Sequence, residues 1–453
     1  MNYKKTIQDI WKDIQNKDIT YHRNGKHYVV TISDRNIDNY RQTGNIGVFF
    51  VNGACISIYE LMKRFDGCYD KVLNLLTAKG VSQERGIQLI ESSLNILNEE
   101  MTFIKRDNVG LSFPYFAHID ITSKCNMNCL HCLNPSEIYN ENDLTTAQWI
   151  NAIDQFHELG ISVLWIGGGE PLLREDLFDI LSHARKYHMR VVLATNGLHL
   201  NSETVSIIAP LLDEITVCLD GSVSDVHEFL RKPKGNFKII VSNILSTKDT
   251  IHNSKCLLKI FSCVAMHNVD DVCNIIDLAY NLGADSWACQ TFVPMNRGGR
   301  YSEQILSNQK RNTLAEMIES KSKEYEGRMQ VQNYVPLVTM KKVYSTPRME
   351  CSAGNAIIYV ASDGSVFPCS RLTFPQFYIG NISMIDLVNK WKTSDVFKSF
   401  RNIQTTKTFC GDCTHFQLGM CNGGCKAEKF RAFGSIYDHP DPQCGNFLYR
   451  DRK

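Results

Sequence analysis

Strand-like apolar runs alternate with segments of helical periodicity from residue 108 to about residue 315, and this alternation constrains the fold more than any other feature of the chain. Six such runs occur: FAHIDIT, SVLWIGGG, RVVLATNG, EITVCLDG, CLLKIFSCVAM and DSWACQTFVP. Repeated strand–helix units build a parallel sheet with right-handed crossovers. The sequence therefore predicts an α/β partial barrel of the (β/α)6 type, with its chemistry at the carboxyl ends of the strands.

Further blocks flank this predicted barrel, which we place at residues 108–315. Residues 1–107 start with a hairpin signal, because Asn24–Gly25 separates two strand-like runs, and continue with a third run and three amphipathic helical segments. This order predicts a small winged-helix-like α+β domain. Residues 316–350 are expected to bridge the barrel to a loop-rich, cysteine-rich block at 351–453.

The composition excludes several classes of protein. Lys and Arg number 49 and Asp and Glu 48, so the charge balance indicates no binding to nucleic acid or to an anionic membrane. The N-terminal stretch MNYKKTIQDIWKDIQNKD is charged throughout, unlike a signal peptide, and no apolar stretch is long enough to cross a bilayer. We therefore expect a cytoplasmic protein with no membrane and no nucleic-acid partner.

Three of the 17 cysteines crowd the stretch ITSKCNMNCLHCLNP, directly after the first strand-like run. Cys125, Cys129 and Cys132 follow the spacing C-x3-C-x2-C, and in a reducing compartment such spacing indicates metal or cluster ligation. Three thiolates leave one iron of a four-iron cluster open to substrate. A zinc ion would need His131 as a fourth ligand, but adjacent residues rarely both reach one tetrahedral ion, so the spacing favours a cluster.

The same residues resemble the defining motif of the radical S-adenosylmethionine (SAM) superfamily, with His131 where Tyr or Phe is commoner. WIGGGEPLL, at the end of the second strand-like run, resembles the family's glycine–glycine–glutamate motif at Gly168, Gly169 and Glu170. The resemblance implies a TIM-like radical SAM barrel and a 4Fe–4S cluster whose open iron binds SAM. It also implies that the second strand end and Glu170 hold the SAM amino group.

Three further candidate SAM contacts come from the same resemblance. ATNG with Asn196 ends the third run, and CLDG with Asp220 ends the fourth, where Cys218 stands in place of the usual serine. EFLRKPKGNF resembles the segment whose arginine pairs with the SAM carboxylate, which implies that role for Arg231. The family chemistry implied is reductive cleavage of SAM to a 5′-deoxyadenosyl radical, with an external electron donor such as flavodoxin or ferredoxin.

The cysteines after residue 350 resemble a SPASM domain, which implies two auxiliary iron–sulfur clusters. The implied ligands of one cluster are Cys410, Cys413, Cys421 and Cys444, and those of the other are Cys351, Cys369 and Cys425. The second set has no obvious fourth ligand. Its fourth position stays open or takes a non-cysteine ligand, another cysteine such as Cys289, or a substrate thiol. A zinc ribbon is the alternative interpretation.

Residues 51–80 resemble the leader-recognition module of enzymes that modify ribosomally made peptides, which implies that residues 1–107 bind the leader of a precursor peptide as an added strand. Together the resemblances predict a radical SAM/SPASM peptide maturase that installs an intramolecular thioether, as in the makers of sactipeptides and ranthipeptides. The alternatives are a carbon–carbon crosslinking, epimerising or sulfatase-type maturase, a nucleic-acid-modifying radical SAM enzyme, and a zinc-binding scaffold.

Overall fold

The computed structural model divides into two compact units, residues 1–34 with 45–112 and residues 35–44 with 113–453. The residues it describes are 10–12, 14, 19–24, 27–32, 48–98, 114–133, 142–333, 351–401, 410, 423–437, 439–442 and 444.

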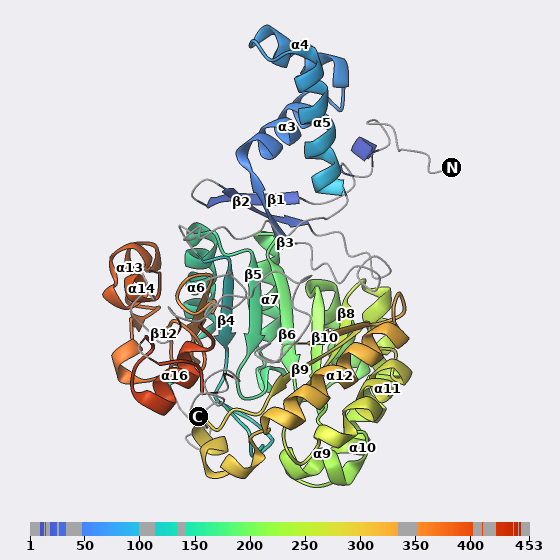
Figure 1. The fold of residues 1–453 in the computed structure, drawn as a ribbon, viewed down its shortest axis with the longest axis vertical. Coiled ribbons are helices and arrows are strands. Elements are labelled where there is room, and N and C mark those ends of the chain that lie inside the picture. Colours follow the sequence, from blue (N-terminus) through green and yellow to red (C-terminus); the bar gives the residue numbers. More distant parts are fainter. Residues whose placement is uncertain are drawn as a thin grey trace. The chain divides into compact units, whose positions relative to one another are not determined.

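The N-terminal unit pairs a small antiparallel sheet with three helices (Figure 1). The sheet has the order β1-β2-β3, and Asn24 pairs with His27, as the hairpin signal predicted; Gly25 lies outside the described residues. Met62, Val72 and Ile90 are completely buried, so one apolar stripe from each helix meets in the core of this unit. The elements are β1 (Ile19–Asn24), β2 (His27–Ile32), β3 (Val48–Asn52), α3 (Gly53–Arg64), α4 (Tyr69–Ala78) and α5 (Gln83–Asn98).

The larger unit contains the predicted partial barrel. All six expected strands are present, parallel and adjacent in chain order, and a seventh parallel strand extends them at one edge. The strands are β4 (Phe116–Asp120), β5 (Val163–Gly167), β6 (Arg190–Thr195), β7 (Glu214–Cys218), β8 (Leu257–Val264), β9 (Ser286–Thr291) and β10 (Gln330–Asn333). The connecting helices are α6 (Thr146–Leu159), α7 (Leu177–Lys186), α8 (Ser202–Ile208), α9 (Ser224–Leu230), α10 (Asn236–Asn253), α11 (Val272–Asn281) and α12 (Asn308–Glu324).

Side chains at alternate positions of the barrel strands point to the two opposite faces of the sheet. Ala117 and Ile119 of β4 are completely buried in the main apolar core, together with residues of α6 and α7. Side chains of successive strand residues point to opposite faces, so His118 and Asp120 lie on the other side of the sheet. The apolar core lies between the sheet and its helices. We call the opposite face of the sheet, which carries His118 and Asp120, the inner face.

The C-terminal block joins the sheet at its other edge. β11 (Ile357–Val360) pairs in parallel with β4, and β12 (Ser365–Phe367) and β13 (Gly380–Asn381) continue the sheet antiparallel. Residues 316–333, assigned above to the bridge, form the end of α12 and the strand β10, which pairs with β9. The remaining helices of this block are α13 (Leu387–Thr393), α14 (Asp395–Arg401) and α16 (Lys426–Phe433). Among the described helices, none has the length and apolarity needed to span a membrane.

Candidate active site

The three cysteines of the C-x3-C-x2-C motif lie in the loop that follows β4, where the carboxyl ends of the strands gather. Cys125 and Cys129 are partly buried against the barrel core. Burial, with a smaller contribution from the neighbouring Cys132 and Cys125, raises the pKa of Cys129 to about 12 against the opposing effect of Arg231. Three thiols that influence one another in this way suit an iron–sulfur cluster, whose binding would displace their protons.

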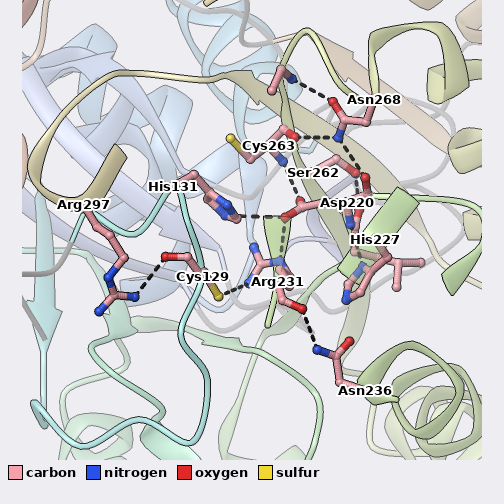
Figure 2. Close-up of polar contacts among 12 residues, drawn as sticks. Cys129, His131, Asp220, His227, Arg231, Asn236, Ser262, Cys263, Asn268 and Arg297 are labelled. Atoms are coloured by element: carbon pink, nitrogen blue, oxygen red, sulfur yellow. Dashed lines mark hydrogen bonds and ion pairs between the residues drawn. The ribbon is translucent and has the colours of Figure 1, made fainter. Parts of the chain in front are cut away.

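Two neighbouring segments hold this loop in place. On one side, the backbone N–H groups of Asn128 and Leu130 donate to the carbonyls of Lys232 and Leu230, at 2.9 and 2.8 Å. On the other side, Nη1 of Arg297, in the short 3-10 helix Asn296–Arg300, donates to the carbonyl of Cys129 at 2.9 Å (Figure 2). The cysteines are therefore presented by a backbone that is fixed before any cluster binds.

The two motif glycines after β5 pack against the start of the cysteine loop. The N–H of Gly169 donates to the carbonyl of Thr122, and the N–H of Glu170 to that of Lys124, both at 2.7 Å. A Cβ atom at Gly169 would lie 2.1 Å from the carbonyl oxygen of Lys124, and Gly168 has a φ of +134° that other residues rarely adopt. Close approach to the cysteine loop thus explains both glycines before any ligand is considered.

Glu170 lies at the junction of β5 and β6 and is completely buried. Its carboxylate accepts hydrogen bonds from Oγ1 of Thr195 and the N–H of Asn196, both at 2.7 Å, and from the N–H of Leu172 at 3.1 Å. Burial raises the pKa of this carboxyl group despite these donors. Glu170 therefore fastens the two strand ends together; its predicted contact with the SAM amino group stays a prediction.

Asn196 connects the third strand end to the cysteine loop. Its Nδ2 donates to Oδ1 of Asn126 at 2.7 Å, and its Oδ1 accepts from the N–H of Leu198 at 3.0 Å. Asn126 lies between Cys125 and Cys129 in the sequence. The ATNG segment thus positions the loop, and a contact between Asn196 and SAM stays a prediction.

Asp220 and Arg231 form a buried ion pair beside Cys129 (Figure 2). Nε of Arg231 lies 2.6 Å from Oδ2 of Asp220, and Nη1 of Arg231 lies 3.9 Å from Sγ of Cys129. Burial opposes ionisation of Asp220, yet the Arg231 guanidinium and His131 hold the pKa of its carboxyl below the usual value. The fixed positive charge next to the thiols suits a site for anionic thiolates and for a carboxylate.

His131 contacts the same ion pair. Its Nε2 lies 3.4 Å from Oδ2 of Asp220, and burial lowers its pKa to about 4, so the imidazole is neutral at pH 7. Among the described residues, no three His, Cys, Asp or Glu side chains converge as ligands of a metal ion would. A cluster is bound through separate irons, so its thiolates stand further apart than the ligands of one ion.

A second group of cysteines lies in the C-terminal block. Cys351, Cys369 and Cys425 pack against one apolar core, and burial followed by the charge of Cys351 raises the pKa of Cys425. Cys289, considered above as a fourth ligand, is instead completely buried in the barrel core. Cys410 is buried and Cys444 partly buried, whereas Cys413 and Cys421 lie outside the described residues.

The neighbour of Cys289 on β9 reaches toward the second cysteine group. Oε1 of Gln290 accepts a hydrogen bond from Nη2 of Arg371 at 2.7 Å. Burial disfavours the charge of Arg371, but Cys425 and Cys369 beside it raise its pKa. Because Gln290 has the opposite orientation to Cys289 on the strand, this bond ties the cysteine group to the inner face of the barrel.

One polar group at the site was not predicted from the sequence. Tyr359 of β11 donates its hydroxyl hydrogen to Oδ2 of Asp120 at 2.6 Å, and Nε2 of His118 lies 3.4 Å from Oδ1 of the same carboxylate. The polar residues at alternate positions of FAHIDIT were a signal for His118 and Asp120. No local signal pointed to Tyr359, which is 239 residues away.

Two family models match the chain. One, described as the radical SAM superfamily, matches residues 119–279, and one described as an iron–sulfur cluster-binding domain, SPASM, matches residues 351–414. The AdoMet-dependent heme synthase of Methanosarcina barkeri is 28% identical over 349 residues, which cover 74% of this chain and 96% of that protein. The mycofactocin maturase MftC of Mycolicibacterium smegmatis is 27% identical over 340 residues, covering 74% and 83%.

Solved structures share the fold. SuiB of Streptococcus suis bound to S-adenosylmethionine superposes with a TM-score of 0.68 at 14% identity, covering 94% of this chain and 99% of that one. The enzyme anSMEcpe with bound AdoMet gives a TM-score of 0.57 at 15% identity, covering 75% and 98%. The predicted radical SAM and SPASM fold, the predicted SAM-dependent radical activity and the predicted iron–sulfur and SAM cofactors are confirmed by these matches.

Proposed function

We propose that this chain, a radical SAM enzyme with a SPASM domain, installs an intramolecular thioether in a ribosomally synthesised precursor peptide by joining a cysteine sulfur to a carbon of another residue. The observation that carries this proposal is the bond between Arg371 and Gln290. It connects the group of Cys351, Cys369 and Cys425 to the inner face, where we place the SAM site. This bond supports a substrate whose thiol and target carbon both lie along the inner face.

The described residues fit the expected cofactors. Cys125, Cys129 and Cys132 would hold the 4Fe–4S cluster, which with bound SAM supplies the 5′-deoxyadenosyl radical. Arg231 and Asp220 keep a buried charge pair beside that loop, and Arg231 retains guanidinium N–H groups that suit the SAM carboxylate. The pinned loop and the motif glycines hold these groups in register, which limits the space for water around a reactive radical.

A peptide substrate is favoured over the tetrapyrrole chemistry named for the heme synthase. The match to that relative covers nearly all of the relative but leaves about a quarter of this chain outside. SuiB covers almost the whole chain at the level of fold, and one of its structures is bound to the precursor peptide SuiA. The sheet of the N-terminal unit ends in β1 and β3, and a leader peptide added as a strand would pair with such an edge.

The test is co-expression with each short open reading frame that neighbours this gene and encodes cysteine, followed by mass spectrometry. We expect one peptide to lose two hydrogens per crosslink and its cysteines to resist alkylation. A peptide that keeps its mass under reducing conditions with excess SAM contradicts the proposal. Two hydrogens lost with cysteines that still alkylate would indicate a carbon–carbon crosslink instead.

Two variants separate the parts of the proposal. Cys129→Ala should abolish turnover and leave leader binding intact, because the motif loop lies in the larger unit. Deletion of residues 1–107 should abolish modification of the full precursor, whereas a sulfatase-type maturase would not need this unit. An external flavodoxin or ferredoxin is expected to replace chemical reductant in the same assay.

A further inference from the structure

Three residues in mutual contact, His118, Asp120 and Tyr359, lie where β4 meets β11. The strand register places Tyr359 directly beside His118, with their rings edge to face at 5.2 Å. Oδ2 of Asp120 accepts from the Tyr359 hydroxyl at 2.6 Å, and Oδ1 of Asp120 lies 3.4 Å from Nε2 of His118. We call these residues the inner triad.

The neighbouring strand leaves room for the inner triad. Gly167 of β5 pairs with Asp120, and a Cβ atom there would lie 3.3 Å from Oδ1 of Asp120 and 3.4 Å from Nε2 of His118. Trp165 pairs with His118 on the same strand. At the paired positions of the described strands, the titratable groups beside His118 are Asp120 on its own strand and Tyr359 on β11, because β5 contributes a tryptophan and a glycine there.

His118 is the accessible member of the triad. Its side chain is 29% exposed, against 9% for Asp120, and Tyr359 is almost completely buried. In the part of the chain that the structure describes, Nδ1 of His118 bonds no other group. With Nε2 directed at a carboxylate, the proton of a neutral imidazole resides on Nε2, and Nδ1 keeps a free lone pair.

The inner triad is connected to both cysteine groups. Asp120 ends the strand that leads into the loop of Cys125, and Tyr359 belongs to the C-terminal core against which Cys369 packs. Burial and then the charge of Asp120 raise the pKa of the Tyr359 hydroxyl well above its usual value, so it remains a hydrogen-bond donor. A substrate that spans the two cysteine groups would pass His118.

We propose that Nδ1 of His118 accepts the proton of the substrate thiol when the carbon–sulfur bond forms, and that Asp120 and Tyr359 hold the imidazole for this transfer. The inference rests on the thioether function proposed above. The target carbon first loses a hydrogen atom, which leaves in 5′-deoxyadenosine. The S–H bond then breaks, its proton goes to His118, and the sulfur bonds to the carbon radical. The bond formation leaves one surplus electron, and an oxidised auxiliary iron–sulfur cluster held by the group of Cys351, Cys369 and Cys425 would supply the acceptor for it. The peptide would then lose two hydrogens in all.

The chain offers a matched control on its outer helices. Nε2 of His183 lies 2.6 Å from Oδ1 of Asp154, and the Tyr187 hydroxyl donates to the same oxygen at 2.7 Å. This outer triad has the same three residue types but lies on α6 and at the C-terminal end of α7, on the far side of the apolar core from the inner face. Equal substitutions in the two triads separate a role in the reaction from the general cost of removing such a group.

The experiment compares His118→Gln and Tyr359→Phe with His183→Gln and Tyr187→Phe, using the peptide that the wild type crosslinks. We expect His118→Gln to keep forming 5′-deoxyadenosine, with deuterium transferred from a labelled peptide, while crosslinking at pH 7 falls about a hundredfold, as for loss of a general base. Raising the pH to about 9 should restore much of the crosslinking activity of His118→Gln, because the substrate thiol then ionises without a base. Tyr359→Phe should show a smaller loss with the same rescue, and the outer variants should match the wild type.

Two results would overturn the inference. Crosslinking by His118→Gln at the wild-type rate would show that another group takes the proton. Loss of 5′-deoxyadenosine formation together with crosslinking would assign His118 to the stability of the SAM site rather than to proton transfer. Failure of the proposed function is distinct from both, since the wild type itself would then give no two-hydrogen loss with protected cysteines.

Discussion

Nε of Arg231 lies 2.6 Å from Oδ2 of Asp220, and both side chains are buried next to the cysteine loop. This ion pair therefore has two roles: it contributes to the stability of the barrel, and it orients an arginine at the expected SAM site. The arginine expected to bind the SAM carboxylate is already held by a protein carboxylate, so its guanidinium is oriented before SAM arrives. Asp220 in turn fixes β8, because its Oδ1 accepts from the N–H of Cys263 at 2.8 Å.

Arg231→Met should destabilise the protein by about 3–5 kcal/mol, because it leaves the charge of Asp220 buried without its partner. The measurement is anaerobic urea unfolding of the variant and the wild type. Lys310→Met is the control: its pair with Asp270 is exposed, so the loss should stay below about 1 kcal/mol. Equal effects of the two substitutions would contradict the assignment of a buried pair.

Stability should fall as the pH drops from about 6.5 toward 4, in part because of His227. Burial lowers the pKa of this completely buried imidazole to about 4, below the value of about 6.5 in an unfolded chain. Between about pH 6.5 and pH 4, His227 is protonated in the unfolded chain but neutral in the folded protein, so lowering the pH favours unfolding. The contribution between pH 7 and pH 5 is about 2 kcal/mol.

His227→Asn tests this dependence, because the amide oxygen can replace Nδ1, which accepts from the N–H of Asp220 at 3.0 Å. Urea midpoints at pH 7 and pH 5 should differ less in the variant than in the wild type. His199→Asn, at an exposed imidazole, controls for the loss of a histidine ring as such. If the urea midpoint of His227→Asn depends on pH as strongly as that of the wild type, His227 does not contribute to the loss of stability in acid.

Gly169→Ala should displace the cysteine loop, because the new Cβ atom would lie 2.1 Å from the carbonyl oxygen of Lys124 and backbone cannot yield as a flexible side chain can. We expect lower iron content after anaerobic reconstitution and loss of the electron paramagnetic resonance change on adding SAM. Gly299→Ala is the control, since its nearest neighbour, the carbonyl oxygen of Pro294, would lie 3.8 Å away. Normal iron content in Gly169→Ala would show that the loop tolerates the shift.

Cys425→Ala and Cys289→Ala should differ in iron and sulfide content. Cys425 packs with the C-terminal cysteine group, so its loss should remove an auxiliary cluster. Cys289 is buried in the barrel core, and its substitution should cost stability while leaving the iron content unchanged. Loss of iron in Cys289→Ala would show that it is a ligand after all.

The sequence by itself determined the strand–helix alternation, the motif loop after β4 and the position of the glycine–glycine–glutamate motif one unit later. These features are local: residue spacing and hydrophobic period are properties of short segments, and parallel strands in chain order bring their ends to one edge. The burial of Cys289 in the barrel core follows from the same period of two along β9.

Only the tertiary structure decided which groups meet. Tyr359 reaches Asp120 because β11 adds beside β4, and the partners of Glu170 are found on β6 because β5 and β6 are adjacent. Gly169 is required by the backbone of Lys124, which no periodicity reveals. Such contacts depend on strand register and on which distant segment fills an edge, and both are set by packing of the whole chain rather than by any single stretch of it.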